Sequence, residues 1–442
     1  MPSPLSSGLN SSPVQAAAWL NIVAKLGGTA LSFLLYLALA RLMTPGAFAD
    51  VVVMIAWVSF GATLACFSFP LALVRFVPEN LSRGRADLAR GAVQFSIALT
   101  EGVAIAIAAA SALAILLGVV ELPRDMPRSA LAAAALVVPS VLLLLLAGIL
   151  TALKRAAASE ILVNVMRPLL VLFGLAGLWM LRPAPLTAPW VMAVYLAASM
   201  IMVVVCLCYC VAILPRELAR AKPTYAIREW TSVAAGFMVI AVLAALYERV
   251  DLMVMGLTAP PAEIAAYAVA ARFAQTVVVA VNAASAVMAP HLVERLPDLQ
   301  AGRRHEVQRL VRDTARTSLW VSVIALGAFA ALAPLFLKLF GPHYESAYRP
   351  LVILAVGQAI CTLFGPAAGI ATLAGAPRIA ILGLLCGTLA NVALNLMLVP
   401  RFGATGAAFA TATGMVCLSA VAWLLTRHRF HLDTSVFHVR PL

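Results

Sequence analysis

Apolar runs long enough to cross a membrane recur along the whole chain. Crossing the hydrocarbon core of a bilayer takes about 20 apolar residues in helical form, and these runs lack the two-residue alternation of a membrane β-barrel. The pattern therefore predicts an all-α polytopic membrane protein with about 12 transmembrane helices. The runs cover residues 17–41, 47–70, 91–119, 129–153, 158–181, 187–214, 231–257, 263–290, 317–340, 347–373, 379–400 and 404–426.

Composition supports this prediction. Of the 442 residues, 63% are hydrophobic and 11% are charged, whereas about 25% of residues are charged in soluble domains. The formal net charge of +13 raises the question of nucleic-acid binding, but most basic residues fall in short loops between the apolar runs. Their positions therefore bear on membrane topology, and we expect no nucleic acid among the partners.

The basic residues divide unevenly between the two sides of the membrane. An even number of crossings puts both termini on one side, and the segments on that side carry 20 Lys and Arg residues against 7 on the other. Because cytoplasmic loops concentrate Lys and Arg, the pattern predicts a multi-pass protein with both termini in the cytoplasm.

A long connection near the middle divides the chain. It is rich in Pro, Lys and Arg, which suits a solvated cytoplasmic linker. The predicted units are a tail (1–16), an N-terminal six-helix lobe (17–214), the linker (215–230), a C-terminal six-helix lobe (231–426) and a second tail (427–442).

A second long connection precedes residue 317. Helical spacing puts Val307, Leu310 and Val311 on one face of residues 305–312. This pattern predicts an interfacial helix on the inner leaflet.

The two halves share a short motif. Ala147–Leu153 is similar to Ala368–Ala374, and the glycines of the two copies, Gly148 and Gly369, are 221 residues apart, half the length of the chain. Six helices in each half give both copies the same orientation, as in transporters built from parallel repeats.

Basic residues inside the predicted helices are the first functional candidates, because an uncompensated charge at the membrane centre costs about 2.5–3.5 kcal/mol. Lys25 and Arg167 lie roughly 12–13 Å from the cytoplasmic ends of their helices, and Arg272 lies close to the midplane. All three can line a wet cavity. Lys25 can instead snorkel to the headgroups, and Arg167 can instead pair with Glu160 through Asn164.

Intramembrane carboxylates suggest coupling or gating. Glu101, near mid-depth, can neutralise a cation, carry a proton or form a buried pair. Glu248, Arg249 and Asp251 lie towards the periplasmic end of their helix, with Glu248 and Asp251 on one face. We interpret these three as a periplasmic gate or a contact between the lobes.

Two asparagines, Asn391 and Asn395, lie one turn apart on one helical face. They can hydrogen-bond sugar hydroxyls or cross-link helices. Gly383 and Gly387, on the same helix, have the spacing that allows close helix approach, which favours the cross-link.

Enzyme chemistry has little support in the sequence. The seven cysteines lie within apolar runs, where they act as small hydrophobic residues. The six histidines are scattered over loops and the tail, and neither a nucleophile motif nor a phosphate-binding GxxxxGK[ST] loop is present. We therefore expect no catalytic residues, metal site or cofactor.

Three stretches resemble one family. They are Ser68–Glu79, the segment from Arg249-Val250-Asp251 to Tyr267, and Asn391 and Asn395 followed by Leu398–Thr411. Together they resemble polysaccharide flippases of the multidrug/oligosaccharidyl-lipid/polysaccharide exporter superfamily, over residues 17–426. One departure is Ala266, where the family often has glycine.

The resemblance implies two six-helix lobes around a central cavity that opens alternately to each side. The expected substrate is an undecaprenyl-diphosphate-linked oligosaccharide, moved across the bacterial inner membrane for lipopolysaccharide or exopolysaccharide biosynthesis. The expected partners are this lipid-linked oligosaccharide, membrane lipids and other polysaccharide-assembly proteins. Lys25, Arg167 and Arg272 would then bind the diphosphate, since ammonium and guanidinium groups pair with phosphate oxygens.

Two alternatives stay open. A cation-coupled drug exporter of the same superfamily is one, although its commonly cationic substrates match a basic cavity poorly. A membrane-embedded glycosyltransferase or polysaccharide polymerase is the other, although it would need a large periplasmic loop or catalytic acids near an interface.

Overall fold

The computed structural model describes residues 13–119, 126–181, 185–275 and 304–437. These residues are almost entirely helical, and among them the sole β-bridge joins Met43 to Leu186. The helices are α1 (Pro13–Leu42), α2 (Pro45–Cys66), α3 (Phe69–Ser82), α4 (Ala86–Leu116), α5 (Met126–Ala152), α6 (Ala156–Glu160), the π-helix η1 (Ile161–Met166), α7 (Arg167–Leu181), α8 (Ala188–Ile213), α9 (Arg216–Arg220), α10 (Ile227–Thr258), a helix over 261–275, α12 (Arg304–Phe340), the 3₁₀-helix η2 (Pro342–Ala347), α13 (Tyr348–Leu363), α14 (Ala367–Leu373) and α15 (Pro377–Phe430).

The predicted all-α membrane fold is confirmed. Nine helical stretches of the described chain are long and apolar enough to span a membrane. One of them, α15, covers two predicted spans. Gly403 has non-helical dihedral angles and separates the two halves of α15, each of which corresponds to one span. The run predicted at 263–290 is helical over 261–275, and its remainder lies outside the described residues.

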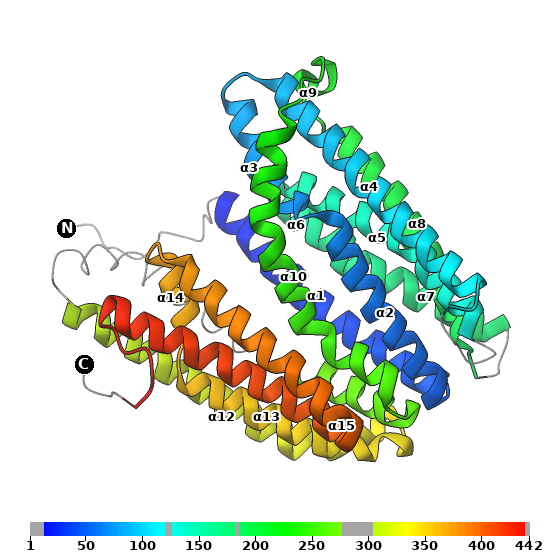
Figure 1. The fold of residues 1–442 in the computed structure, drawn as a ribbon, viewed down its shortest axis with the longest axis vertical. Helices are drawn as coiled ribbons and strands as arrows, with labels where there is room; N and C mark the ends of the chain where they lie inside the picture. Colours follow the sequence, from blue (N-terminus) through cyan, green and yellow to red (C-terminus); the bar gives the residue numbers. More distant parts are fainter. Residues whose placement is uncertain (1–12, 120–125, 182–184, 276–303, 438–442) are drawn as a thin grey trace, which may run out of the picture.

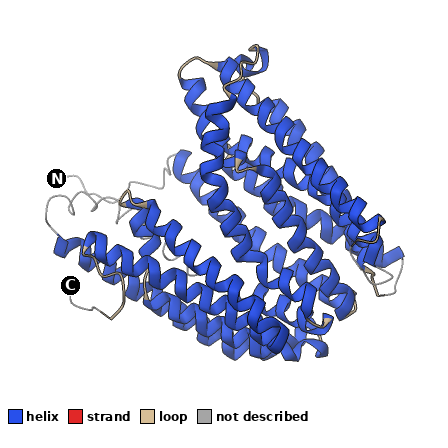
Figure 2. Cartoon of the chain, viewed as in Figure 1, coloured by secondary structure: helices blue, strands red, loops and turns tan. Residues whose placement is uncertain are grey.

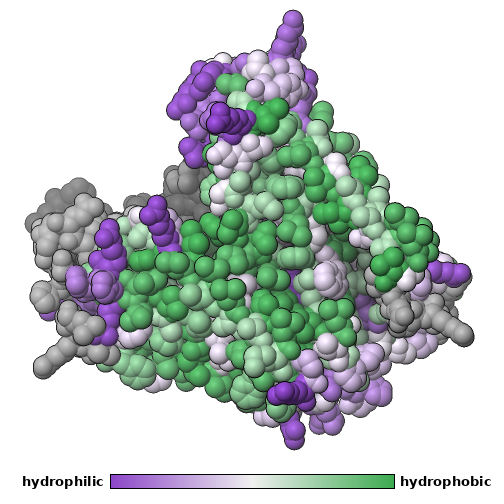
Figure 3. All heavy atoms as spheres, viewed as in Figure 1, coloured by the Kyte–Doolittle hydropathy of each residue, from purple (hydrophilic) through white to green (hydrophobic). Residues whose placement is uncertain are grey.

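The helices form two lobes that meet at one end and diverge towards the other (Figure 1). Figure 2 shows that short loops join the helices at both ends. The lobes share one apolar core at the joined end, which includes Phe48 and Met54 from α2 with Tyr344 from η2. In the space-filling view, hydrophobic residues cover the middle of both arms and hydrophilic residues gather at their tips and at the joined end, as a membrane protein requires (Figure 3).

Helix α10 belongs to both lobes. Its first turns pack on the N-terminal lobe, where the Trp230 ring lies 5.9 Å from that of Phe95 in α4. Its second half packs on α15, where the Thr388 hydroxyl donates to the Leu243 carbonyl (3.3 Å). The predicted lobe boundary at residue 231 therefore falls within a helix that connects the two lobes.

The linker predicted to be solvated is docked on α4. Arg90 donates from its guanidinium to the carbonyls of Ala219 and Ala221, which end the short helix α9. The Thr224 hydroxyl donates to the Asp87 carboxylate (2.7 Å), and the Thr224 N–H donates to the Asp87 carbonyl (3.2 Å). The linker is thus anchored to α4 at Arg90 and Asp87, while most of its side chains stay exposed.

The prediction of a separate interfacial helix at 305–312 is wrong, since these residues are the first turns of the continuous helix α12. Val311 is buried against Ile370 and Leu432. Leu432 belongs to residues 431–436, which fold back onto the lobe, so the predicted C-terminal tail is partly structured. Val311, one of the apolar residues that suggested contact with lipid, is covered by the protein itself.

The repeated motif forms the same turn in both lobes. After α5, Lys154 donates its N–H to the Thr151 carbonyl (3.0 Å) and Arg155 to that of Leu150 (2.8 Å). After α14, Gly375 and Ala376 repeat both bonds to Thr372 and Ala371, at 3.1 Å and 2.8 Å. This is the Schellman pattern of helix termination, and it supports a repeat in the sequence.

Candidate functional site

Three arginines from the two lobes are candidates for one site around Tyr195 of α8. Arg167 of α7 and Arg272 of the 261–275 helix both interact electrostatically with the Tyr195 hydroxyl of α8. Arg249 of α10 interacts electrostatically with Arg272. The guanidinium of Arg272 also lies over the Tyr36 ring of α1, 5.2 Å from its centroid. We call the sequence-predicted residues Arg167, Arg249 and Arg272 the arginine cluster, because these charge effects link them through Tyr195 and Arg272.

A π-helix positions Arg167. Pro168 has no N–H, so one carbonyl of the preceding turn has no helical donor, and η1 lies immediately before this point. The wider turn rotates Arg167 relative to a regular helix. Its Nε donates to the Ser199 hydroxyl (3.1 Å), and its Nη2 lies 3.5 Å from the Ser140 hydroxyl.

The alternative pairing of Arg167 with Glu160 is not formed in the described chain. Asn164 does donate to the Glu160 carboxylate (2.6 Å), but Arg167 turns to α5 and α8. Gly28 of α1 packs over this region, where an added Cβ would lie 2.6 Å from the Asn164 carbonyl oxygen. Arg167 is therefore held by neutral hydroxyls, which leaves its charge available to an anion.

Aromatic rings close the lobes together beside the arginine cluster. Phe33 of α1 contacts Phe273 and Phe340 of the C-terminal lobe, with ring centroids 5.0 Å and 5.7 Å apart. The Arg272 Nη1 donates to the Gln275 side-chain oxygen (3.0 Å), one turn along its own helix. The Tyr36 ring and the Gln275 side chain therefore fix the position of this guanidinium.

Asp251 has a different setting from its neighbours in sequence. It is buried and accepts hydrogen bonds from the Tyr267 hydroxyl and from the Leu252 N–H (2.7 Å). The Tyr267 hydroxyl also lies 3.1 Å from the Thr411 hydroxyl of α15. Glu248 is exposed instead. Asp251 thus joins three helices of the C-terminal lobe. Towards the end of α10, Gly256 packs against Val53 of α2 and makes a contact between the lobes.

Asn391 and Asn395 are fully buried in a helix cross-link. Asn391 donates to the Tyr247 carbonyl of α10 (3.1 Å), and Asn395 donates to the Asn391 side-chain oxygen (2.7 Å). A Cβ on Gly387 would lie 2.8 Å from the Gly414 carbonyl oxygen, so the two halves of α15 approach closely. This arrangement matches the cross-linking alternative, and sugar contact at these residues stays a prediction.

Two other predicted residues lie away from the arginine cluster. Lys25 is exposed on α1, eleven residues before Tyr36 and so about 16 Å along the helix. Glu101 lies within the N-terminal lobe, near Cys66 of α2. Neither is brought together with the three arginines.

Sequence reasoning missed the contact that closes the joined end. Arg41 of α1 donates to the carbonyls of Leu339 and Lys338 at the end of α12, the second at 3.1 Å. The Tyr344 hydroxyl lies 3.5 Å from the Ala40 carbonyl oxygen. A pocket of about 450 Å³ surrounds this contact, with Trp179 and His343 in its wall. Arg41 ends an apolar run, where a basic residue reads only as a charge at the membrane boundary, so no sequence signal singles it out.

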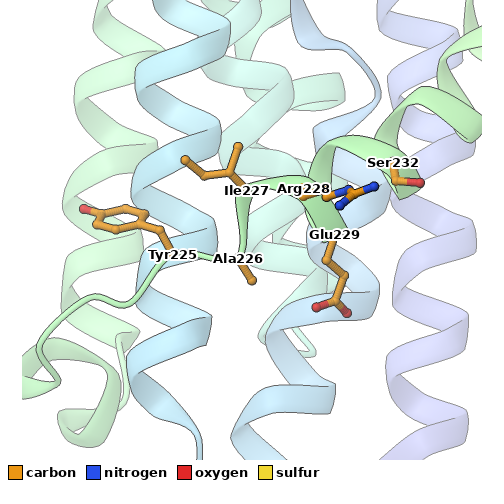
Figure 4. A pocket seen from close by; sticks show the side chains of 6 residues that line it. All are labelled: Tyr225, Ala226, Ile227, Arg228, Glu229 and Ser232. Carbon is orange, nitrogen blue, oxygen red and sulfur yellow. The ribbon is translucent and has the colours of Figure 1, made fainter.

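A second hollow lies at the start of α10, lined by Tyr225, Arg228, Glu229 and Ser232 among others (Figure 4). It is an open surface feature and shares no residue with the arginine cluster. We therefore do not assign the candidate site to it.

The Leu398–Thr411 signature forms a tight connection between two spans. Gly403 has φ +52°, and a Cβ there would lie 1.5 Å from a Glu263 carboxylate oxygen. That carboxylate accepts the Ala404 N–H (2.8 Å) at the start of the following helix. A Cβ on Gly406 would lie 2.4 Å from the Leu398 carbonyl oxygen. These motif residues, together with Glu263, therefore have a structural role.

The cluster's chemistry suits an anion. Guanidinium groups bind carboxylate and phosphate oxygens through paired N–H donors. No group of three or more His, Cys, Asp or Glu residues that could hold a metal ion occurs in the described parts of the chain. The guanidinium groups of the arginine cluster give the site the donors to bind an anionic group.

Comparison with known proteins is consistent with this geometry. The family model described as "Polysaccharide biosynthesis protein" matches residues 15–295. A search of curated proteins gave no match.

Solved structures resemble the chain over nearly its whole length. A multidrug resistance MATE family transporter of the MOP superfamily, in its inward-facing conformation, is 12% identical with a TM-score of 0.73, covering 91% of this chain and 94% of that one. Its outward-facing conformation is 13% identical with a TM-score of 0.65, covering 95% and 96%. The lipid II flippase MurJ, inward closed, is 12% identical with a TM-score of 0.73, covering 92% and 87%. At these identities the likeness concerns the fold alone.

Proposed function

Because the chain belongs to the family of polysaccharide biosynthesis proteins, we propose that it moves an undecaprenyl-diphosphate-linked oligosaccharide across the bacterial inner membrane. Family and fold make it a transporter of the MOP superfamily. The proposed step supplies the outer leaflet with substrate for lipopolysaccharide or exopolysaccharide biosynthesis, where other assembly proteins use it.

The arginine cluster is the observation that carries this proposal. Arg167 comes from the N-terminal lobe, and Arg249 and Arg272 come from the C-terminal lobe, so a group between the lobes meets cations from both. A diphosphate is doubly suited to such a site because each phosphate offers oxygens to a guanidinium fork. Conformational change that parts the arginines would weaken binding and release the substrate.

Two observations support a cytoplasmic opening between the diverging arms. These arms carry α9 and the other segments of the more basic side, which cytoplasmic loops favour. The TM-score is also higher for the inward-facing than for the outward-facing MATE transporter, 0.73 against 0.65. Alternating access then requires the contact between Arg41 and α12 to open.

The remaining candidates have supporting roles in the proposal. Lys25, exposed on α1, attracts the anionic headgroup on its way to the arginine cluster. Asn391 and Asn395 contact the glycan only in a conformation in which α10 and α15 separate. Glu101, Glu248, Arg249 and Asp251 serve coupling or gating.

Complementation of a flippase-deficient strain tests the proposal. Lys25→Ala, Arg167→Ala and Arg272→Ala should each lower glycan export while membrane abundance stays unchanged. Arg401→Ala, at an exposed position of α15, is the matched control and should export normally. Full export by all three variants contradicts the cationic site.

A drug-exporter function predicts another outcome. Cells that express the protein would then extrude cationic dyes and resist cationic drugs without restoring glycan export. That result would replace the flippase proposal with the alternative from the same superfamily.

A further inference from the structure

The pocket around the contact that closes the joined end has a volume of about 450 Å³. Small-molecule sites in proteins span about 300–1,000 Å³, so this pocket has room for a ligand. Its wall comes from both lobes. The end of α1, the start of α2 and Trp179 of α7 belong to the N-terminal lobe, whereas Phe340 of α12 and the start of η2 belong to the C-terminal lobe. A ligand in the pocket would therefore touch both lobes at once.

Buried aromatic residues make the floor of the pocket. Tyr344 and Phe340 are buried with ring centroids 6.2 Å apart, and the Phe48 ring of α2 lies 6.1 Å from that of Tyr344. On the N-terminal side, the Leu186 N–H donates to the Leu42 carbonyl (2.8 Å) and ties the connection before α8 to the end of α1. The floor is thus organised in advance, which lowers the cost of ordering it around a ligand.

The rim of the pocket has hydrogen-bond donors to spare. Arg41 donates its Nε and Nη2 to the carbonyls at the end of α12, and its Nη1 makes no hydrogen bond with any residue that the structure describes. The Thr44 hydroxyl accepts the Ala47 N–H (3.3 Å) as the cap of α2, so its own O–H remains to donate. His343 of η2 is exposed in the wall. Since none of the described residues that line the pocket is Asp or Glu, these donors favour an anion.

Trp179 adds a surface that suits a sugar ring. Its side chain lies in the wall and is 49% exposed. An indole offers a broad apolar face and one N–H donor, and a sugar ring offers an apolar face of C–H groups with hydroxyls around its edge. A sugar that carries a carboxylate would stack on the indole and reach the guanidinium of Arg41.

We infer that this pocket binds a short acidic saccharide and that the bound saccharide holds the joined end closed. The ligand contacts Arg41 and Trp179 from one lobe and His343 from the other, so it binds only while the lobes stay together. A ligand that binds one state shifts the equilibrium towards that state. The inference rests on the proposed function, which places the joined end in the periplasm, where exported glycan collects. Accumulated product thereby slows further export.

Isothermal titration calorimetry on the full chain in lipid nanodiscs tests the class of ligand. Digalacturonic acid should bind saturably. Galactobiose has the rings without the carboxylates, and inorganic phosphate has the charge without the rings, so each should bind at least about tenfold more weakly. Equal affinity for either of them contradicts an acidic saccharide, and the absence of saturable binding by digalacturonic acid overturns the site.

Substitutions in the wall locate the binding. Trp179→Ala and His343→Ala should each lower the affinity for digalacturonic acid about tenfold, and Trp179→Phe, which keeps a ring, should recover most of it. Trp57→Ala is the matched control, because it removes a tryptophan of α2 that is 45% exposed and lies outside the pocket; it should bind normally. Recovery by Trp179→Phe separates lost stacking from unfolding. Native affinity in both Trp179→Ala and His343→Ala overturns the pocket.

The effect on conformation is measured with spin labels. Ser82→Cys and Leu373→Cys, in a background without the native cysteines, place labels at exposed ends of α3 and α14 and report the distance between the diverging arms (Figure 1). At about ten times its Kd, digalacturonic acid should lower the ratio of molecules with arms together to molecules with arms apart about tenfold. Trp179→Ala should respond much less at the same concentration.

A distance distribution that ignores digalacturonic acid, or moves towards arms together, contradicts the closing role. Calorimetry and spin labelling both use the purified protein and need no transport. Loss of glycan export in cells would therefore count against the proposed function alone, whereas loss of binding would count against the pocket alone.

Discussion

The guanidinium of Arg41 donates hydrogen bonds across the lobes to the carbonyl of Leu339 and to that of its neighbour Lys338. Both acceptors lie in the last turn of α12, where carbonyls have no helical donors and carry the negative end of the helix dipole. One residue of the N-terminal lobe thus caps a helix of the C-terminal lobe. This contact holds the joined end closed.

We predict that Arg41→Ala shifts the protein towards separation of the joined end. A cation at a helix C-terminus contributes about 0.3–2 kcal/mol, so the ratio of open to closed molecules should rise by between about 2-fold and about 30-fold. Spin labels at Thr44→Cys and Pro342→Cys would report the longer distance. Arg401→Ala should leave the distribution unchanged, and an unchanged distribution in Arg41→Ala would show that the aromatic contacts suffice.

The fold was predictable where one physical signal dominates. Apolar length alone located the spans, because lipid admits only helices whose backbone groups are internally bonded. The breaks were not predictable. Nothing in the residue types of Phe67 and Ser68 signals a left-handed conformation, and Val311 of α12 is covered by Leu432, more than a hundred residues away.

Gly403→Ala should destabilise the C-terminal lobe. A Cβ at this position would collide with Glu263, and its backbone, with φ +52° and ψ −129°, is a conformation that costs a non-glycine residue about 1–3 kcal/mol. The thermal unfolding midpoint of the purified protein in detergent should fall. Gly369→Ala is the matched control, because that glycine lies in α14 with open space around it; its midpoint should stay equal or rise.

Lys154→Gly should stabilise the N-terminal lobe. Lys154 has φ +64° at the turn where the other lobe places Gly375 with φ +81°. Relief of the left-handed strain should contribute about 0.5–1 kcal/mol after the greater freedom of glycine in the unfolded chain is counted. Lys154→Ala removes the same charge without easing the backbone and should give no gain. Equal stabilisation by both variants would assign the effect to charge instead.

The site was predictable in its residue types and less so in its geometry. Their charge within the predicted spans singled out Arg167, Arg249 and Arg272, since a charge inside the membrane is costly and marks a functional site by default. Their grouping depends on tertiary contacts, such as the ring of Tyr36 beneath Arg272. Helical spacing suggested Glu160 as a partner for Arg167, but the π-helix between them changes the register of the face.

The C-terminal segment 431–436 should stabilise the turn between α13 and α14, which it contacts. The Asp433 carboxylate accepts from Trp423 Nε1 (2.9 Å) and from the N–H and hydroxyl of Ser435 (2.9 Å and 2.7 Å). The Thr434 hydroxyl donates to the Phe364 carbonyl at the break (2.8 Å). Asp433→Ala should therefore lower the free energy of unfolding by about 1–3 kcal/mol.

Gly365→Ala should detach the same segment by disturbing the residue that Thr434 packs against. A Cβ on Gly365 would lie 1.9 Å from the Thr434 carbonyl oxygen, and its φ of +69° disfavours alanine. Limited proteolysis should cut residues 431–436 faster in both Gly365→Ala and Asp433→Ala, because each loses contacts that bury this backbone. Phe437→Ala, at an exposed position past the segment, should be cut at the native rate. If Asp433→Ala is destabilised but not cut faster, its hydrogen bonds stabilise α15 through Trp423 and do not fasten the segment.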